Sequence, residues 1–276
     1  MTKTLLITGV STGFGRALSE AALAKGYRVV GTVRSEAAKA EFEALKPGQA
    51  FGRILDVTDT ASIPRIVAEI ERAGGAIDVL VNNAGYGFEG ILEESTLDEV
   101  RHQFEVNVFG AVAMMQAVLP YMRKRRAGRI LNITSMGGYI TFPGIGVYNG
   151  SKFALEGISE ALAKEVKGLG IHVTAVAPGG FRTDWAGRSL IRKERSIADY
   201  DAVFDPVRKR RQEMSGKQVG DPKKAAEAML TLIEADNPPM HLLLGSDALK
   251  LVREKLDFLK SEIDAWEKLT LSTDVS

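Results

Sequence analysis

The chain has 276 residues, and its 36 Lys and Arg against 35 Asp and Glu give a net charge of +1. Balanced charge gives no bulk argument for binding to nucleic acid or to a membrane surface, and the absence of cysteine excludes disulfides, thiolate nucleophiles and cysteine metal sites. The amino-terminal apolar run is too short for a signal peptide, and no run approaches the roughly 20 residues of a membrane span. We therefore expect a cytoplasmic protein.

Short runs rich in β-branched residues alternate along the chain with longer segments of helical spacing. The runs are almost continuously apolar, which is typical of strands buried on both faces. They predict strands at 4–8, 27–33, 50–57, 77–83, 128–134, 171–178 and 240–245. Apolar residues recurring at three- and four-residue intervals predict helices at 14–25, 36–45, 60–73, 97–126, 148–168 and 222–235. The alternation predicts an α/β fold: a Rossmann-type doubly wound parallel seven-stranded sheet with helices on both faces.

Two segments depart from this alternation. Residues 182–221 form a long insertion between the last two predicted strands, in which aromatic residues mix with the basic clusters RKER and RKRR. Residues 246–268 follow the last strand and predict one more amphipathic helix.

Three glycines, Gly9, Gly13 and Gly15, lie between the first predicted strand and the first helix. Glycine lets a backbone approach a pyrophosphate, and a helix N-terminus supplies free N–H groups and a favourable dipole. No Lys-Ser/Thr pair follows, which excludes a Walker loop, and the spacing is not G-x-G-x-x-G. This stretch favours a phosphate site over the alternative, a tight turn whose glycines serve only packing.

Further motifs follow in a fixed order. They are NNAG at 82–85, Ser135, Tyr148-x-x-x-Lys152 and PGG at 178–180, each at the end of a predicted strand or the start of a predicted helix. Together with the glycines, the set resembles the short-chain dehydrogenase/reductase family, in its compact single-domain branch, over roughly residues 3–245. The glycine spacing differs from that of the extended sugar-nucleotide branch, and the Tyr–Lys spacing from that of the enoyl-reductase branch.

The resemblance implies a catalytic set of Asn107, Ser135, Tyr148 and Lys152. Tyr148 and Lys152 are four residues apart and share a helix face, and a nearby cation lowers the pKa of a phenol from about 10. By resemblance, Tyr148 is the general acid/base, Ser135 holds the substrate oxygen, and Asn107 helps to hold a water that links Lys152 to solvent. The alternatives are that Tyr148 and Lys152 are an ordinary amphipathic helix pair, that Ser135 caps a strand-end turn, and that Asn107 is a polar residue that bends its helix.

The resemblance also implies a nicotinamide dinucleotide site. The positions that match it are Gly9, Ser11, Thr12, Gly13, Phe14, Gly15, Arg34, Asp56, Val57, Asn83, Ala84, Gly85, Tyr148, Lys152, Pro178, Gly179, Phe181 and Thr183. Asp56 is expected to accept from the adenine amino group, with a helix-capping role as the alternative. The Phe181 backbone and the Thr183 hydroxyl are expected to meet the carboxamide.

The residues at the end of the second predicted strand indicate which cofactor is used. Val33 stands where the family's acid would be, and Arg34 follows. A guanidinium can hold a 2′-phosphate through two parallel bonds, and Ser35 can add a hydroxyl. We therefore expect NADP(H) to be preferred, with NAD(H) possible. Thr12 departs from the basic residue that many NADP-dependent members carry there, and the alternative for Arg34 is a solvated charge at a strand end.

The insertion at 182–221 is expected to be the substrate lid, as in the family. An apolar pocket is predicted from Trp185, Tyr200 and Phe204 with Met136, Tyr139, Ile140, Phe142, Tyr86 and Phe88, each of which is alternatively a core residue. The lid's basic residues predict a solvated helix face rather than a site for an anionic substrate. His102, His172 and His241 have no metal-ligand spacing, so we expect no catalytic metal.

These observations predict an NADPH-dependent reductase of an apolar ketone or aldehyde, reversible as an alcohol dehydrogenase. An NAD-dependent alcohol dehydrogenase and a non-catalytic cofactor sensor are the alternatives. The expected organisation is a dinucleotide-binding and catalytic domain at 1–245 with a C-terminal helical extension at 246–276 packed on it. By resemblance, a homodimer is expected through the helices at 98–126 and 148–168.

Overall fold

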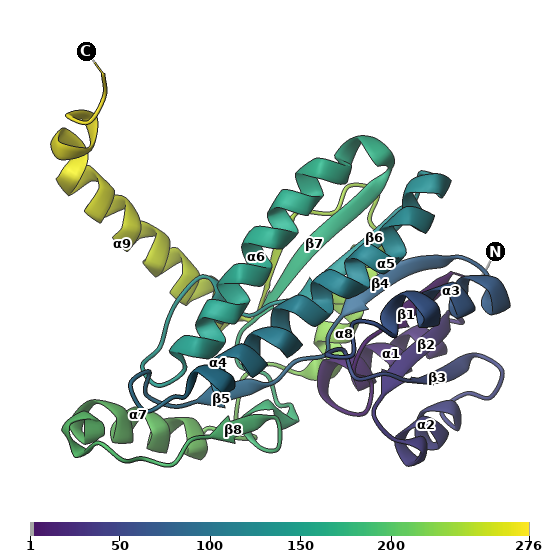
Figure 1. Cartoon of the computed structure of the whole chain (residues 1–276), viewed down its shortest axis with the longest axis horizontal. Helices are drawn as coiled ribbons and strands as arrows, with labels where there is room; N and C mark the ends of the chain where they lie inside the picture. Colours follow the sequence, from purple (N-terminus) through teal and green to yellow (C-terminus); the bar gives the residue numbers. More distant parts are fainter. Residues whose placement is uncertain (1–2, 276) are drawn as a thin grey trace.

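The computed structural model describes residues 3–275 and confirms the predicted seven-stranded parallel sheet (Figure 1). The strand order is β3-β2-β1-β4-β6-β7-β9, and every pairing is parallel. The strands are β1 (Thr4–Ile7), β2 (Arg28–Val33), β3 (Ala50–Ile54), β4 (Ile77–Asn82), β6 (Gly128–Ile133), β7 (Ile171–Pro178) and β9 (His241–Leu244).

Helices cover both faces of this sheet. One face carries α1 (Gly13–Ala24), α2 (Glu36–Glu43) and α8 (Pro222–Glu234), whose buried side chains share a core with the strands. The other face carries α3 (Ile63–Gly74), α5 (Gly110–Arg125) and α6 (Gly146–Val166) around a second core. Alternate strand residues supply the two cores: Leu5 and Ile7 face one, and Leu6 faces the other. This explains why the strands are almost continuously apolar.

The chain reverses its direction of travel across the sheet between β1 and β4. The strands β1 to β3 run outward on one side, and the later strands run outward on the other. In open α/β sheets, ligands bind beyond the carboxyl ends of the strands at such a switch point. The glycine stretch follows β1 and the NNAG segment completes β4, so both lie at this crevice.

The segment predicted as one helix at 97–126 contains a π-helical turn. It comprises α4 (Leu97–Phe104), the π-turn Glu105–Phe109 and α5. Leu97–Arg125 is long and apolar enough to cross a membrane by length and composition alone. Met114, Met115, Val118 and Met122 of this stretch are nevertheless buried in the core of the domain. It is therefore a core helix interrupted by a π-turn.

A second, two-stranded sheet was not predicted. It pairs β5 (Gly87–Glu89) with β8 (Leu190–Arg192) in parallel. The strand β8 belongs to the 182–221 insertion, which continues into α7 (Asp201–Glu213). The insertion is thus fastened to the segment that follows β4.

The last helix, α9 (Ser246–Leu271), projects away from the sheet (Figure 1). Ala248 and Val252 are its buried residues among those described. The expectation that the extension packs on the domain is therefore wrong beyond its first two turns, where the large apolar side chains from Leu256 to Leu271 are exposed.

Candidate active site

The paired Tyr148 and Lys152 lie in the first two turns of α6. Both are buried, with 6% and 7% of their surface exposed. The Lys152 Nζ donates to the Ile133 carbonyl at the end of β6, at 2.8 Å, and lies 5.8 Å from the centre of the Tyr148 ring. The residue order on α6 therefore places an amine and a phenol together at the carboxyl edge of the sheet.

Ser135 lies beside this pair, just after β6. Its Oγ accepts from the Gly137 N–H at 3.0 Å, and a Cβ placed on Gly137 would lie 3.3 Å from this Oγ and 3.4 Å from Cε1 of Tyr148, so the hydroxyl lies near the phenol ring. Because the Gly137 N–H occupies a lone pair of Oγ, the Ser135 proton is free to be donated. The structure thus shows the turn cap that was considered from sequence, and the other role, holding a substrate oxygen, stays a prediction.

Burial shifts both ionisable groups away from their charged forms. It raises the pKa of Tyr148 to about 12, although the bond to Ser135 acts in the opposite direction. Burial also lowers the pKa of Lys152 to about 8, opposed by the charge of Glu156. Burial dominates the pKa of Tyr148 while the Lys152 amine is held at the Ile133 carbonyl, and the expectation that Lys152 lowers the pKa of Tyr148 stays a prediction.

Asn107 occupies the π-turn between α4 and α5. Its Nδ2 donates to the Tyr86 carbonyl at 3.0 Å and to the Ser151 Oγ at 3.1 Å, and its Oδ1 accepts from the Tyr86 N–H at 3.1 Å. A Cβ on Gly85 would lie 3.1 Å from that Oδ1 and 3.8 Å from the Lys152 Nζ. Asn107 therefore lies beside the lysine and also pins the loop after β4. Single-turn π-bulges of this kind are frequent at functional sites.

Sequence reasoning missed Glu156, one helical turn beyond Lys152. It is buried and accepts from the hydroxyls of Thr134 and Tyr139. His241 Nδ1 lies 3.1 Å from the same carboxylate. The i, i+4 spacing from Lys152 is a signal that could have found it. Glu156 therefore links Thr134, the residue before Ser135, to α6, the helix that carries Tyr148.

The three glycines of the first turn prove to have different roles. A Cβ on Gly15 would lie 2.2 Å from the Gly9 carbonyl oxygen, and one on Gly9 would lie 3.1 Å from the Ala84 Cα. Gly9 and Gly13 have φ of +71° and +60°, which L side chains rarely adopt. Only the Cβ position of Gly13 opens onto space, its nearest neighbour being Thr183 at 3.8 Å. Gly15 and Gly9 thus serve close packing, whereas Gly13 faces the crevice at the start of α1.

The loop after β4 supports this turn. Asn83 Nδ2 donates to the carbonyls of Thr8 and Gly9 at 2.9 and 2.8 Å. The Thr8 hydroxyl accepts from the Asn83 and Ala84 N–H groups, each at 3.0 Å. Of the NNAG positions, Asn83 therefore acts through the glycine turn, and Ala84 and Gly85 are small because other groups pack against them.

Arg34 lies exposed at the end of β2. Within residues 3–275 it has no ion pair, so its guanidinium is available to an anion. The Ser35 Oγ accepts from the Ala38 N–H at 3.3 Å and caps α2, which leaves its own proton to donate.

Asp56 lies past β3, near this basic side chain. Hydrogen bonds from Thr58, and to a smaller degree the charge of Arg34, lower the pKa of Asp56. Its Oδ1 takes both Thr58 bonds, at 3.0 and 2.7 Å. Asp56 thus stays ionised and caps its own turn, whereas Ser62 is the N-cap of α3. Val57 is buried against Gly110 of α5.

The PGG turn after β7 is held by a second residue that sequence reasoning missed. Asp247, at the start of α9, accepts from the Gly180 N–H at 2.7 Å, and its Oδ1 lies 2.3 Å from a Cβ placed on Gly179. Phe181 then packs edge-on against Phe14 of α1. The turn thereby reaches α1, so Pro178 to Thr183 and the glycine stretch border one crevice.

The predicted aromatic pocket does not form as a unit. Trp185 does lie over Tyr148, with ring centres 5.2 Å apart. Phe204, in contrast, is fully buried on the inner side of α7. The hydroxyl of Tyr139 bonds to Glu156, and that of Tyr200 bonds to Glu93. Of the lid aromatics named from sequence, Trp185 is therefore the one beside Tyr148.

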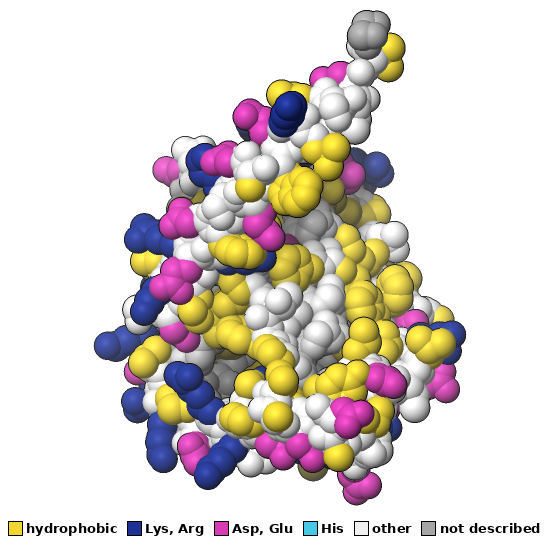
Figure 2. All heavy atoms as spheres, turned by 90° about the vertical axis from the view of Figure 1, so that its left-hand side faces the viewer, with side chains coloured by type: hydrophobic (Ala, Val, Ile, Leu, Met, Phe, Trp, Pro, Cys, Tyr) yellow, Lys and Arg dark blue, Asp and Glu magenta, His cyan; other side chains and the backbone are white. Residues whose placement is uncertain are grey.

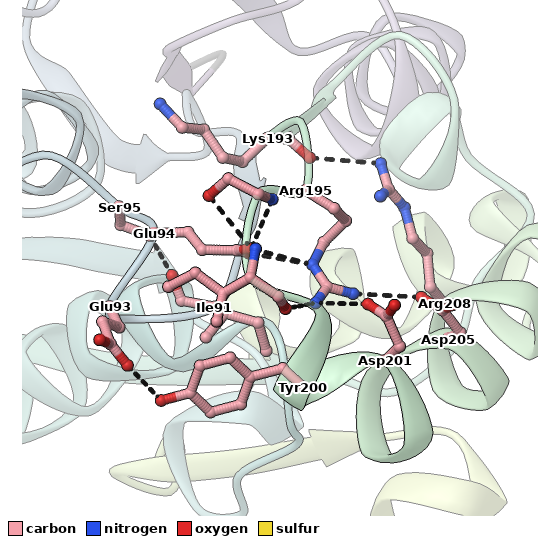
Figure 3. A network of polar contacts seen from close by, with 12 residues as sticks. Ile91, Glu93, Glu94, Ser95, Lys193, Arg195, Tyr200, Asp201, Asp205 and Arg208 are labelled. Atoms are coloured by element: carbon pink, nitrogen blue, oxygen red, sulfur yellow. Dashed lines mark hydrogen bonds and ion pairs between the residues drawn. The ribbon is translucent and has the colours of Figure 1, made fainter.

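The lid's basic clusters correct another expectation. They were expected to form a solvated face, but Arg192, Arg208 and Arg211 surround the fully buried carboxylate of Glu89. Arg195 bonds to the buried Glu94, which also accepts from the backbone N–H groups of Ser196 and Ile197 (Figure 3). These arginines fasten the lid to β5 and to the segment after it, whereas Lys209 and Arg210 of the same clusters are exposed as expected.

A family model for short chain dehydrogenases matches residues 3–193, and the chain belongs to this family. It is 39% identical over 248 residues to a 3-ketodihydrosphingosine reductase of Bacteroides thetaiotaomicron, covering 87% of each chain. It is 33% identical over 227 residues to an NADPH-dependent 3-dehydrocapnine reductase of Ornithobacterium rhinotracheale, covering 80% of each.

Solved structures agree with this assignment. A short-chain dehydrogenase from Streptomyces avermitilis superposes with a TM-score of 0.93 at 41% identity, covering 99% of this chain and 98% of the other. ElxO with NADP bound gives 0.75 at 27% identity, covering 91% and 100%. A member from Burkholderia phymatum in complex with NAD gives 0.83 at 25%, covering 95% of each. The chain is thus an oxidoreductase of this family.

Proposed function

We propose that this oxidoreductase is an NADPH-dependent reductase of ketones or aldehydes, with Tyr148 as the general acid. The observation that carries the proposal is the convergence of Tyr148, Ser135 and Lys152 at the switch-point crevice, where Lys152 lies near Gly85 and Trp185 lies against Tyr148. The names of the two relatives support it, since they specify reduction of a 3-keto and a 3-dehydro compound.

The crevice fits a nicotinamide dinucleotide. Gly13 offers the open start of α1, where free N–H groups favour a pyrophosphate. Arg34 and Ser35 offer a guanidinium and a hydroxyl at the position where the 2′-phosphate of an NADP adenosine would bind. Position 33 is a valine, so no carboxylate there repels this phosphate. These features favour NADP(H). An NAD complex of one structural neighbour keeps NAD(H) as the alternative cofactor.

When bound, the nicotinamide supplies the hydride. Ser135 holds the carbonyl oxygen with its hydroxyl, and Tyr148 gives that oxygen its phenolic proton as negative charge develops. A protonated Lys152 stabilises the resulting phenolate, and Asn107 beside it lines the route by which the proton is replaced. With the pKa of Lys152 lowered to about 8, this aid is present at neutral pH and fades as the pH rises past 8.

Two alternative functions, an NAD-dependent alcohol dehydrogenase and a non-catalytic cofactor sensor, can be compared with the proposed reductase. An NAD-dependent alcohol dehydrogenase would use the same residues in the oxidative direction, and the exposed Arg34 argues against it. A cofactor sensor would need no acid, whereas Tyr148 and Lys152 are both present and placed together. We further propose a cytoplasmic homodimer acting on an apolar substrate, with Trp185 against its apolar part.

The test is a pair of cofactor titrations followed by a turnover screen. In a Trp266→Phe background the remaining tryptophan is Trp185, beside Tyr148, so its quenching reports binding in the crevice. We expect NADPH to bind at least tenfold more tightly than NADH, and apolar ketones to be reduced in an assay of nicotinamide absorbance. Tight binding without turnover over aliphatic, aromatic and 3-oxoacyl compounds would favour the sensor. Preferred NADH binding would favour the NAD-dependent alternative.

A further inference from the structure

The free part of α9 carries an unpartnered apolar stripe. Figure 2 shows apolar side chains along the projecting helix, above the apolar face of the body. Leu256, Leu259, Ile263 and Trp266 are between 39% and 67% exposed. Large apolar side chains gathered on one surface mark an interaction site more often than single exposed residues do.

The spacing of this stripe is that of a coiled-coil seam. Leu249, Val252, Leu256, Leu259, Ile263 and Trp266 follow one another at alternating steps of three and four residues. This heptad pattern places them on one line, as the a and d positions of a two-helix contact. The seam begins in the body, where Val252 is buried, and continues outward without a partner among the described residues.

We propose that this seam binds the α9 helix of a second copy of the chain, antiparallel to it. A membrane surface fits less well, because α9 carries five basic and six acidic side chains and has no excess of positive charge for anionic lipid. Mixed charges beside an apolar seam are instead typical of helices that pair with helices.

The charges beside the seam favour the antiparallel direction. In a parallel pair, Lys255 would face Lys260 of the second copy, and Glu262 would face Glu267, which are two repulsive contacts on each side. In an antiparallel pair, Leu256 meets Trp266 of the second copy and Leu259 meets Ile263. Arg253 then lies near Glu267 of the second copy.

Near the antiparallel axis, Lys260 is already neutralised by Asp264 of its own helix at 2.5 Å. The two Glu262 carboxylates are the like charges that remain close together there. The antiparallel pair thus has one charge repulsion, between the two Glu262 side chains at its two-fold axis. A parallel pair would have two charge repulsions on each side of the seam.

The length of the projecting part of α9 agrees with the antiparallel register in which Leu256 lies opposite Trp266. The free segment 253–271 spans roughly 28 Å at 1.5 Å per residue. Its midpoint lies within about one residue of the centre of the proposed pairing, at Ser261. The tip of each helix therefore reaches the base of the other, and each apolar side chain of the seam is covered.

Charge variants test the direction. Glu267→Arg places two cations together in the antiparallel pair but removes a repulsion from a parallel one. We expect the apparent dissociation constant, followed by the emission of Trp266 on dilution in a Trp185→Phe background, to rise about tenfold. The double variant Arg253→Glu with Glu267→Arg should restore it. Tighter association of Glu267→Arg would overturn the proposal.

Cysteine variants give a second, independent readout, because the chain has no native cysteine. Lys260→Cys, close to the axis, should form disulfide-linked pairs under mild oxidation, and Leu256→Cys should not. The reverse result would indicate a parallel pair and overturn the proposal.

Seam variants test the surface itself. Ile263→Glu should abolish the Lys260→Cys cross-link and the burial of Trp266. Phe258→Glu is the matched control, because Phe258 is 53% exposed on the same helix but lies off the seam. Equal effects of both variants, or a Trp266 blue shift that appears only with anionic phospholipid vesicles, would overturn the proposal.

Discussion

The Glu89→Gln variant tests whether ion pairs hold the 182–221 insertion, the expected lid, in place. Glu89 is fully buried, and its carboxylate takes the guanidinium groups of Arg208 at 3.1 Å, Arg192 at 3.5 Å and Arg211 at closer range. The variant keeps the shape of the side chain but leaves three partly buried cations facing one another. Removing one partner from a buried ion pair costs about 3–5 kcal/mol, so we expect a loss of that size in stability.

Urea unfolding measures this loss, and limited trypsin digestion shows where it falls. We expect faster cleavage within 188–217, because opening of the lid exposes its Arg and Lys residues. The matched control is Glu36→Gln, whose carboxylate is exposed and lies 3.7 Å from Lys39. It should change stability by less than about 1 kcal/mol. If Glu89→Gln behaves like this control in both assays, the ion pairs do not hold the lid.

Three further predictions concern the crevice. Arg34→Asp should reverse the ratio of kcat/KM for NADPH and NADH, and an unchanged ratio would remove Arg34 from cofactor choice. Gly13→Ala and Gly26→Ala impose similar backbone strain of about 1–2 kcal/mol at φ of +60° and +85°, but only the former should weaken NADPH binding. Equal cofactor affinities in the two variants would contradict the role of Gly13. Glu156→Gln removes a negative charge that raises the pKa of Lys152. The fall in kcat/KM that is expected to begin near pH 8 should therefore move to lower pH. A pH profile of kcat/KM, with wild type as the reference, measures this shift. A shift to higher pH would refute this assignment.

The main fold could be predicted because its signals are local. Continuous apolar runs marked the seven strands, and the periodic segments between them marked the helices that form the two cores. The motif order then placed Ser135, Tyr148 and Lys152 at one edge of the sheet. The apolar runs and periodic segments depend on neighbouring residues, and the motif set depends on its resemblance to the family, so neither requires knowledge of the tertiary structure.

The features that were missed depend on residues far apart in sequence. Glu89 and Arg211 are 122 positions apart, and Asp247 holds a turn 67 positions before it. No local pattern pairs such residues, so the lid's arginines looked like a solvated face. The destination of α9 was mispredicted for a related reason: an amphipathic pattern shows that a helix has an apolar face, but not which surface covers it.

In the proposed reaction, Tyr148 protonates a carbonyl substrate during hydride transfer. The direct measurement compares Tyr148→Phe with wild type in NADPH titrations and in single-turnover reduction of the best ketone from the screen. Loss of the hydroxyl should leave NADPH affinity within about threefold and lower the rate at least 100-fold, the scale of general acid catalysis. A variant that binds NADPH and reduces the ketone at the wild-type rate would contradict the account.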